Sequence, residues 1–562
     1  MKAIKGKAFF AGIHVKDRKA LACGMATEVM NDPKEVYISL SQSLGKPAAL
    51  RVEKGQKVKE GQLIAEADGA ISSSVFASIA GEVVDIKEIA GANGGKETYV
   101  IIKGDGSGEK FTLPVLDNPD AAAIKTRIKE AGIVGLGGAG FPAAVKAAPR
   151  TPVDTLILNG AECEPYLTCD HRIMLENADE IARGARYIAK ALGVDKIIIG
   201  IEANKPDCIA VFEKYDDILP VILKKQYPMG SEKHLIYVTT GRKVGIGKLP
   251  ADSGVVVQNV ATALAVCRAI EQGKTLYERV LTVSGKAIKN PKNLWVKVGT
   301  PVKEIIEYCG GEKNSIEDCS PKMRKDLVKI EQQEQEIKSR IQLINEQLAL
   351  LNKDNSETQV KLEKKLEKLQ KYEENKSVHK QRLIQKFLAS IKPKKVIQGG
   401  PMTGLALSTY DVYTHKTTSG ILLLSEDEAA AEQPTPCLNC GMCADVCPMH
   451  LMPMQTGFYA AAGDYEKAAK QGNTICCIEC GACEYTCPAK RPLIQAIRQT
   501  KAYMRAKIMP TPTVKPVDQK GRSAPVVPLT EDGKHPPKEG TTPTAPVASK
   551  LQTDKKENGN GQ

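Results

Sequence analysis

The sequence predicts a chain of several domains that combines α/β and α+β architecture. Its 562 residues exceed the usual size of one domain, about 100–200 residues. Short strand-like segments separated by glycine turns fill the first hundred residues, whereas strands and helical stretches alternate over residues 111–275. A dense run of cysteines between residues 437 and 487 predicts a further, metal-binding domain.

The cysteine run consists of two copies of the spacing C-x₂-C-x₂-C-x₃-C-P. This spacing is typical of bacterial [4Fe-4S] sites, in which the fourth cysteine of each copy binds the cluster held by the other copy. We therefore predict two [4Fe-4S] clusters in a ferredoxin-like α domain at residues 429–510. The ligands of cluster 1 would be Cys437, Cys440, Cys443 and Cys487, and those of cluster 2 would be Cys477, Cys480, Cys483 and Cys447.

Zinc knuckles and disulfides are the alternatives for these cysteines. Zinc sites use two C-x₂-C pairs and need no third cysteine in line, and disulfides require an oxidising compartment. Cys476 could replace Cys477 in a slipped register, but the spacing fits only from Cys477. The other eight cysteines follow no pattern, which indicates a reducing cytosol.

Composition excludes several classes of function. The net charge is +13, but aromatic residues make up only 4% of the chain, which argues against a dedicated nucleic-acid binder. The first residues lack the apolar core and cleavage site of a signal peptide. No apolar run reaches 18 residues, so we expect no transmembrane segment in the chain itself.

Residues 1–110 are predicted to form a barrel-sandwich domain. Residues 52–86 resemble the flattened barrel of biotinyl and lipoyl carriers, which modify a lysine at a hairpin tip. The corresponding tip here, residues 68–70, reads Asp-Gly-Ala and holds no lysine. The domain is therefore expected to have a structural or docking role, without a swinging cofactor.

Residues 111–275 contain a glycine loop, GLGGAGFP, at residues 135–142. The loop matches G-x-G-x-x-G, but a helical pattern precedes it and Phe141-Pro142 follows it, so it does not fit the standard dinucleotide fingerprint. Such dense glycines still let backbone N–H groups approach a phosphate or a flat ring, although a tight structural turn is the alternative.

Four further motifs give this region a family resemblance. The glycine loop with Lys146, NGAECEPYLTCD, YPMGSEK and QNVATA together resemble the FMN- and NADH-binding domain of the RnfC family, the C subunits of Rnf electron-transport complexes. The flavin subunit of respiratory complex I is a more distant relative. The resemblance covers most of residues 1–510.

The resemblance assigns cofactor-binding roles to individual residues. The glycine loop would lie against the flavin and its phosphate, Phe141 would lie near the nicotinamide, and Lys146 would neutralise the FMN phosphate. Leu136 and Ala161 depart from the complex I pattern, so NADH contacts are less firmly implied than FMN contacts. The implied FMN and NADH residues are Gly135, Gly137, Gly138, Gly140, Phe141, Lys146, Asn159, Glu162, Glu164, Asn259 and Thr262.

Residues 276–321 and 392–428 resemble a β-grasp (SLBB-like) module, which an inserted stretch at residues 322–391 divides. In that stretch apolar residues recur mostly every three, four or seven positions, and the pattern breaks at residues 352–356. We predict a coiled-coil hairpin whose arms are each about 45 Å long. A Pro- and Lys-rich tail at residues 511–562 is predicted to be disordered.

The resemblance implies a peripheral, electron-input subunit of an ion-translocating NAD:ferredoxin oxidoreductase. Electrons would pass between NADH, non-covalently bound FMN and the two clusters. Its partners would be the membrane subunits and the ferredoxin-type iron-sulfur subunit of an Rnf complex, with ferredoxin acting indirectly, on the cytoplasmic face of a bacterial or archaeal cell membrane. Two alternatives stay open: a soluble flavin/iron-sulfur cobalamin reductase of a microcompartment, and a flavin-free, cluster-bearing scaffold.

Overall fold

The computed structural model of the chain describes residues 1–92, 94–318, 320–351, 356–429 and 433–508. Two compact units divide the chain, Met1–Met504 and Arg505–Gln562. The domains described below lie in the first unit, except that the last helix continues beyond Met504 to Ile508. The predicted tail at residues 511–562 lies outside the described residues.

A five-stranded parallel sheet forms the centre of the α/β domain, in the order β1-β12-β11-β10-β13. Strands β10, β11 and β13 are almost wholly buried and rich in Val, Ile and Leu, the composition expected where helices cover both faces of a sheet. The strands are β1 (Ile4–Lys5), β10 (Thr155–Gly160), β11 (Lys196–Glu202), β12 (Ile218–Leu223) and β13 (Val255–Asn259).

Helices cover both faces of this sheet. One face packs against α1, α3, α4, α5 and α7, and the other packs against α6 and Phe9 of the N-terminal segment. The helices are α1 (Ala121–Glu130), α2 (Ala143–Lys146), α3 (Cys169–Glu176), α4 (Ala178–Leu192), α5 (Pro206–Phe212), α6 (Glu232–Thr240) and α7 (Val260–Glu271).

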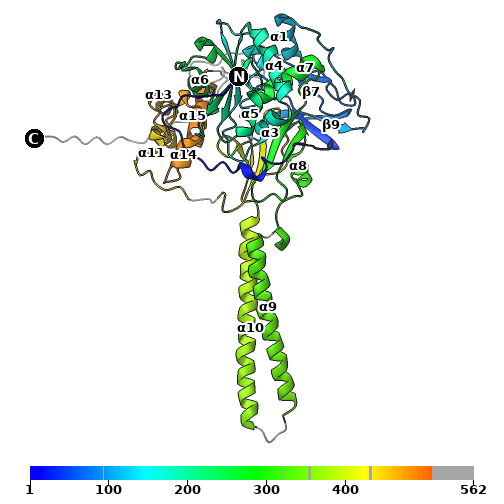
Figure 1. Ribbon diagram of the computed structural model, residues 1–562, viewed down its shortest axis with the longest axis vertical. Coiled ribbons are helices and arrows are strands. Elements are labelled where there is room, and N and C mark those ends of the chain that lie inside the picture. Colours follow the sequence, from blue (N-terminus) through cyan, green and yellow to red (C-terminus); the bar gives the residue numbers. More distant parts are fainter. Residues whose placement is uncertain (93, 319, 352–355, 430–432, 509–562) are drawn as a thin grey trace, which may run out of the picture. The chain divides into compact units, whose positions relative to one another are not determined.

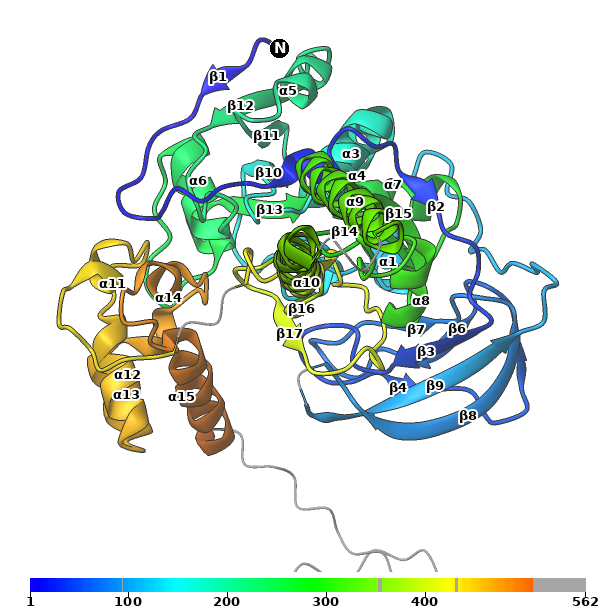
Figure 2. The same ribbon diagram turned by 90° about the horizontal axis from the view of Figure 1, so that it is seen from below.

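The barrel-sandwich domain contains two small antiparallel sheets around one apolar core (Figure 2). The first sheet has the order β3-β9-β8-β5 and the second β4-β6-β7. The first thirty residues, predicted to belong to this domain, instead contribute β1 to the α/β sheet and β2 to the next module. The strands of the domain are β3 (Glu35–Ser39), β4 (Ala49–Leu50), β5 (Lys57–Val58), β6 (Leu63–Glu66), β7 (Val75–Phe76), β8 (Gly81–Ala90) and β9 (Lys96–Gly104).

The β-grasp module is a six-stranded mixed sheet, ordered β17-β16-β18-β14-β15-β2, that packs against α8. Trp295 on β15 is half-buried against the α/β domain, with the Arg268 guanidinium 4.7 Å from its ring centroid. The elements are β2 (Glu28–Val29), β14 (Glu278–Ser284), β15 (Lys292–Lys297), α8 (Val302–Tyr308), β16 (Lys395–Gln398), β17 (Leu405–Leu407) and β18 (Gly420–Leu424).

Two long helices, α9 (Pro321–Ala349) and α10 (Ser356–Ile391), form the predicted hairpin and lie side by side (Figure 1). Ile337 and Ile344 of α9 are buried in the seam between the arms, whereas Leu343 faces outward. Lys380 of α10 forms ion pairs with Glu331 and Glu334 of α9 at 3.1 and 3.0 Å. The two paired arms and their apolar period are as the sequence predicted.

The last domain is a small group of short helices (Figure 2). Its core contains Cys443, Cys483 and three apolar residues of the last helix. The helices are α11 (Met442–Asp445), α12 (Pro453–Ala461), α13 (Tyr465–Gln471), α14 (Ala482–Thr486) and α15 (Leu493–Ile508).

Candidate flavin and iron-sulfur sites

A cavity of about 930 Å³ runs along the edge strand β13 and reaches the carboxyl ends of β10 and β13. Small-molecule sites usually measure about 300–1,000 Å³. In the sheet, β11 lies on one side of β10 and β13 lies on its other side. The strand order therefore reverses next to β10. Ligands of open parallel sheets bind at such switch points, beyond the carboxyl ends of the strands.

The glycine loop forms one wall of this cavity. A β-carbon at Gly137 would lie 2.6 Å from Asn259 Nδ2, so no side chain fits there. A β-carbon at Gly138 would meet no protein atom within 4 Å, so this glycine faces open space. The loop therefore presents bare backbone to the cavity, as close approach of a phosphate or a flat ring requires. The predicted residues that line the wall are Gly135, Gly137, Gly138, Gly140 and Phe141.

Lys146 and Arg150 bring positive charge to the same cavity. Lys146 Nζ donates to Glu232 Oε1 at 2.6 Å and to Val257 O at 3.1 Å. An ammonium group has three donors, so one N–H is left for a ligand. This position beside the glycine loop fits the predicted role of a cation for a phosphate.

Two asparagines, Asn159 and Asn259, line the cavity at the ends of β10 and β13. The Asn159 amide donates to Gly230 O at 2.9 Å. Asn259 caps α7, since its Oδ1 accepts from Ala261 N at 2.8 Å, and its Nδ2 donates to Asp170 Oδ2 at 2.7 Å. These bonds fix both amides at the cavity wall.

Thr262 supports the glycine loop from behind and does not line the cavity. It is fully buried, and its hydroxyl accepts from Leu136 N at 3.0 Å and donates to Val134 O at 3.2 Å. Thr262 would therefore influence a cofactor only by holding the glycine loop in position.

Glu162 and Glu164 also lie outside the cavity lining. Glu162 accepts from Asp170 N at 2.7 Å and from the buried Lys19 ammonium at 3.3 Å. Glu164 accepts from Met402 N at 3.0 Å, in the turn between β16 and β17. Glu162 thus ties the N-terminal segment to the start of α3, whereas Glu164 ties the α/β domain to the β-grasp module. Direct contact of either carboxylate with a flavin or a nucleotide stays a prediction.

Asp170 is a buried carboxylate directly behind the cavity wall. Burial, together with the nearby negative charge of Glu162, raises the pKa of Asp170 to about 6, although the hydrogen bond from Asn259 opposes this shift. The sequence motif NGAECEPYLTCD contains this residue, but nothing in the motif indicated its role.

The eight predicted cluster ligands fall into two separate sites. One cavity, of about 190 Å³, is lined by Cys437, Cys440, Cys443 and Cys487. A second cavity, of about 20 Å³, is lined by Cys447, Cys477, Cys480 and Cys483. These are the two sets that the sequence pairing predicts, and four thiols around one cavity fit a [4Fe-4S] cluster. Cys476 lines neither cavity.

Backbone N–H groups point at sulfur atoms of the second site. Cys477 Sγ accepts from Glu479 N and Cys447 Sγ accepts from Leu451 N, each at 3.3 Å. Hydrogen bonds to sulfur are one of the means by which a protein sets a cluster's reduction potential. The two sites differ in exposure, because Cys437 and Cys440 are exposed while Cys480 and Cys483 are buried.

Two side-chain hydrogen bonds join the α/β domain to the second of these sites. Tyr227 Oη donates to Cys480 O at 2.7 Å, and His234 Nε2 donates to Pro448 O at 3.0 Å. Three residues after Tyr227, Gly230 lines the large cavity. The sequence motif YPMGSEK contains both Tyr227 and Gly230, but nothing in it indicated a contact with the cysteine loops.

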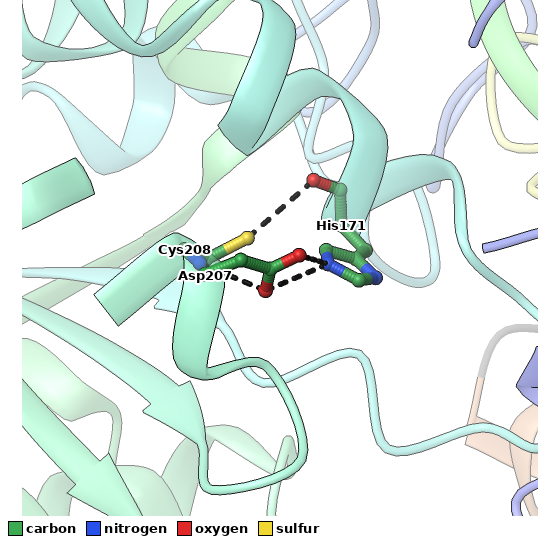
Figure 3. Close-up of side chains that lie close together, drawn as sticks. All are labelled: His171, Asp207 and Cys208. Carbon is green, nitrogen blue, oxygen red and sulfur yellow. Dashed lines mark hydrogen bonds and ion pairs between the residues drawn. The ribbon is translucent and has the colours of Figure 1, made fainter. Parts of the chain in front are cut away.

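A further group of possible metal ligands contains His171, Asp207 and Cys208 (Figure 3). The His171 ring donates to Asp207 at 2.8 Å, and the Cys208 thiol donates to His171 O at 3.6 Å. Burial raises the pKa of the Cys208 thiol far above its usual range, so it stays protonated. These contacts tie α3 to α5, and the group serves as a structural tether.

Four family models match the chain in sequence. They are the RnfC barrel sandwich hybrid domain (residues 7–107), the Nuo51 FMN-binding domain (128–268), the SLBB domain (280–315) and the 4Fe-4S dicluster domain (436–502). They correspond to the barrel-sandwich, α/β, β-grasp and cluster domains described above.

The chain is also similar to known C subunits over most of its length. It is 38% identical over 509 residues to the C subunit of the proton-translocating ferredoxin:NAD(+) oxidoreductase complex of Clostridium ljungdahlii, covering 89% of this chain and 94% of the relative. It is 36% identical to the C subunit of the Na(+)-translocating complex of Acetobacterium woodii, covering 89% and 97%. The chain belongs to the RnfC family. It is thus a C subunit of an ion-translocating ferredoxin:NAD⁺ oxidoreductase, with an FMN-binding domain and a dicluster domain.

The C subunit of the ion-translocating oxidoreductase complex of Rhodobacter capsulatus is 36% identical over 474 residues, covering 82% of this chain and 76% of the relative. Among the described residues of the RnfC-family chain, no helix is both long and apolar enough to cross a bilayer. Family membership decides against the microcompartment cobalamin reductase, and the FMN-domain match argues against a flavin-free scaffold.

Proposed function

We propose that this subunit exchanges electrons with NADH at FMN held in the large cavity, and relays them through its two clusters to the rest of an Rnf complex. When bound, FMN accepts a hydride and passes electrons on singly, and each [4Fe-4S] cluster carries one electron. The observation that carries the proposal is the hydrogen bond from Tyr227 to Cys480 O, because it joins the segment that lines the cavity to a cluster loop.

The residues of the cavity would bind and orient the flavin. The glycine loop offers backbone donors, Lys146 a positive charge, and Asn159 and Asn259 fixed amides. A cofactor held at the switch point of the sheet lies on the same side as Gly230, and thus toward the cluster domain.

The contacts favour one order of electron transfer. Site 2, with Cys447, Cys477, Cys480 and Cys483, has three buried cysteines and is bonded to the α/β domain, so it would exchange electrons with the flavin first. Site 1, with Cys437, Cys440, Cys443 and Cys487, would exchange electrons with the partner, since two of its cysteines are exposed.

The partner's docking surface would surround site 1. Leu438 beside Cys437 is 64% exposed, and Phe458, which also lines this site, is 71% exposed. Apolar side chains around an exposed redox centre suit a transient contact with another electron carrier. By this proposal the partner is the complex's ferredoxin-type iron-sulfur subunit, and membrane subunits hold the assembly on the cytoplasmic face of the membrane.

Anaerobic purification with quantification of iron, acid-labile sulfide and FMN tests the proposal. We expect about eight iron atoms and one FMN per chain, and NADH should bleach both the flavin and the cluster absorption bands. A full iron content with no flavin, or a flavin that NADH leaves oxidised, would refute it.

A further inference from the structure

The tip of the barrel hairpin reaches the large cavity of the α/β domain. All but two of the residues that line this cavity lie between residues 135 and 259. The two exceptions are Ala70, in the tip at residues 68–70 that corresponds to the modified hairpin tip of carrier domains, and Ile71, which follows it directly. A second domain therefore completes the wall of the candidate cofactor site.

Hydrogen bonds hold this tip in place. Lys46 N donates to Ile71 O at 3.0 Å, and the Ser72 hydroxyl donates to Lys46 O at 2.9 Å. Immediately after the tip, the Ser73 hydroxyl donates to Gly132 O at 2.9 Å, just before the glycine loop. The tip is thus a fixed part of the wall, unlike the mobile arm of a carrier.

A second bond fixes the barrel to the glycine loop itself. Leu44 N donates to Gly140 O at 3.1 Å. Gly140 has a left-handed backbone (φ 69°), and a β-carbon there would lie 2.6 Å from Thr417 Cγ2 of the β-grasp module. Three domains therefore meet at this end of the loop, which sets the distance between Ile71 and the loop.

Ile71 combines a fixed backbone with an exposed apolar side chain. Its side chain is 42% exposed and lines the cavity, whereas the neighbouring charges, Lys46 and Asp68, pair with each other at 2.6 Å. An apolar group at the rim of a cavity is stabilised when a ligand with an apolar face covers it. A single exposed isoleucine is ordinary elsewhere on a surface, so its place in the lining is the informative feature.

The depth of the cavity indicates which ligand meets the tip. Asn259 is buried at the carboxyl end of β13, so it marks the inner end of the cavity, where a resident cofactor would be held. Ile71 lies at the exposed rim, which an exchangeable ligand must pass or occupy. We infer that Ala70 and Ile71 contact the bound nicotinamide dinucleotide, with Ile71 against one of its flat rings, so that the barrel domain helps to determine its affinity. This inference rests on the proposed function.

Titration calorimetry of the full-length, FMN-loaded, oxidised protein with NAD⁺ tests the inference without turnover. Ile71→Ala should raise the Kd for NAD⁺ about ten-fold, because one buried aliphatic side chain contributes about that factor. Ala70→Glu should raise it further, since a carboxylate there repels the pyrophosphate of the ligand. Leu50→Ala, on an exposed strand of the same barrel that does not line the cavity, is the matched control and should leave the Kd unchanged.

The results of this titration distinguish failure of the inference from failure of the proposed function. If the unmodified protein binds NAD⁺ and both tip variants bind it equally well, the inference is overturned and the proposed function stands. Loss of FMN from the tip variants would also overturn it, because the tip would then hold the flavin. If the unmodified, FMN-loaded protein does not bind NAD⁺, both the proposed function and the inference fail.

Discussion

At the scale of single residues, Gly138 offers the cleanest test of the cavity. A methyl group at this position meets no protein atom within 4 Å, so folding should tolerate it. It would, however, occupy space that the glycine loop leaves open to a ligand. We expect Gly138→Ala to lower the FMN content of the purified protein several-fold while its iron content and thermal unfolding midpoint stay unchanged.

Gly24→Ala is the matched control for this substitution. Gly24 also has no atom within 4 Å of its added β-carbon, and it does not line the cavity. The assignment of the flavin site is contradicted if the two variants retain equal amounts of FMN.

Asp170 should make the stability of the folded protein depend on pH. Its folded-state pKa is raised from 3.8 to about 6, so folding favours the protonated form. The stability it contributes is fully present below pH 3.8 and is lost as the pH rises through 6. The unmodified protein should therefore lose stability between about pH 5 and pH 7.5, and Asp170→Asn should not. Relative to the unmodified protein, the free energy of unfolding of the variant should rise by about 1 kcal/mol over this range, and its thermal unfolding midpoint should rise accordingly.

Asparagine keeps an oxygen that can accept the hydrogen bond from Asn259, so the variant removes the charge and little else. Thermal unfolding at the two pH values checks this prediction. If the unfolding midpoints of the variant and the unmodified protein differ by the same amount at both pH values, ionisation of Asp170 does not destabilise the folded protein, and the prediction is wrong.

At the scale of elements, the hairpin of α9 and α10 is a separable unit. Ile337 is 6% exposed in the seam, and Leu343 is 57% exposed on the same helix. Ile337→Asp should separate the arms, since a buried unpaired carboxylate costs several kcal/mol. We expect faster proteolysis within residues 321–391, with unchanged FMN, iron and NADH reduction.

Leu343→Asp is the control on the outer face and should resist protease like the unmodified protein. If Ile337→Asp also loses its cofactors, the hairpin supports the domain core and is more than an appended arm.

The sequence predicted those elements whose residue pattern has a local physical cause. The cysteine spacing indicated which four thiols surround each of the two cavities. The apolar period of residues 327–351 indicated the seam of the hairpin, because short-range geometry dictates that period. It did not predict that β1 and β2 would join sheets formed by residues more than 200 positions away. Two-residue strands carry no periodicity, so only tertiary contacts define them.

The candidate site was predictable to a similar extent. The glycine loop, Lys146 and the two asparagines line the cavity as expected, while Glu162, Glu164 and Thr262 lie behind it or beyond it. Motif resemblance identifies such residues together but does not show which side chains face a ligand. The contributions of Ile71 and Tyr227 depend on contacts between domains, which no local pattern encodes.

At the scale of the whole molecule, the domains place three candidate redox sites in one chain. The α/β domain provides the cavity, the barrel and β-grasp domains close around the glycine loop, and the cluster domain bonds to the same α/β domain through Tyr227 and His234. By the proposed function, electrons pass between the flavin cavity, the more buried cluster site and the more exposed cluster site in that order.

The most direct test removes one cluster at a time and follows reduction by NADH with rapid-freeze electron paramagnetic resonance. Cys437→Ala and Cys477→Ala change the equivalent first ligand of each motif, and each variant should retain about four iron atoms and its FMN. NADH should reduce the remaining cluster of Cys437→Ala as fast as in the unmodified protein, whereas the remaining cluster of Cys477→Ala should be reduced far more slowly than its flavin. The opposite pattern, with fast cluster reduction only in Cys477→Ala, would contradict the proposed order.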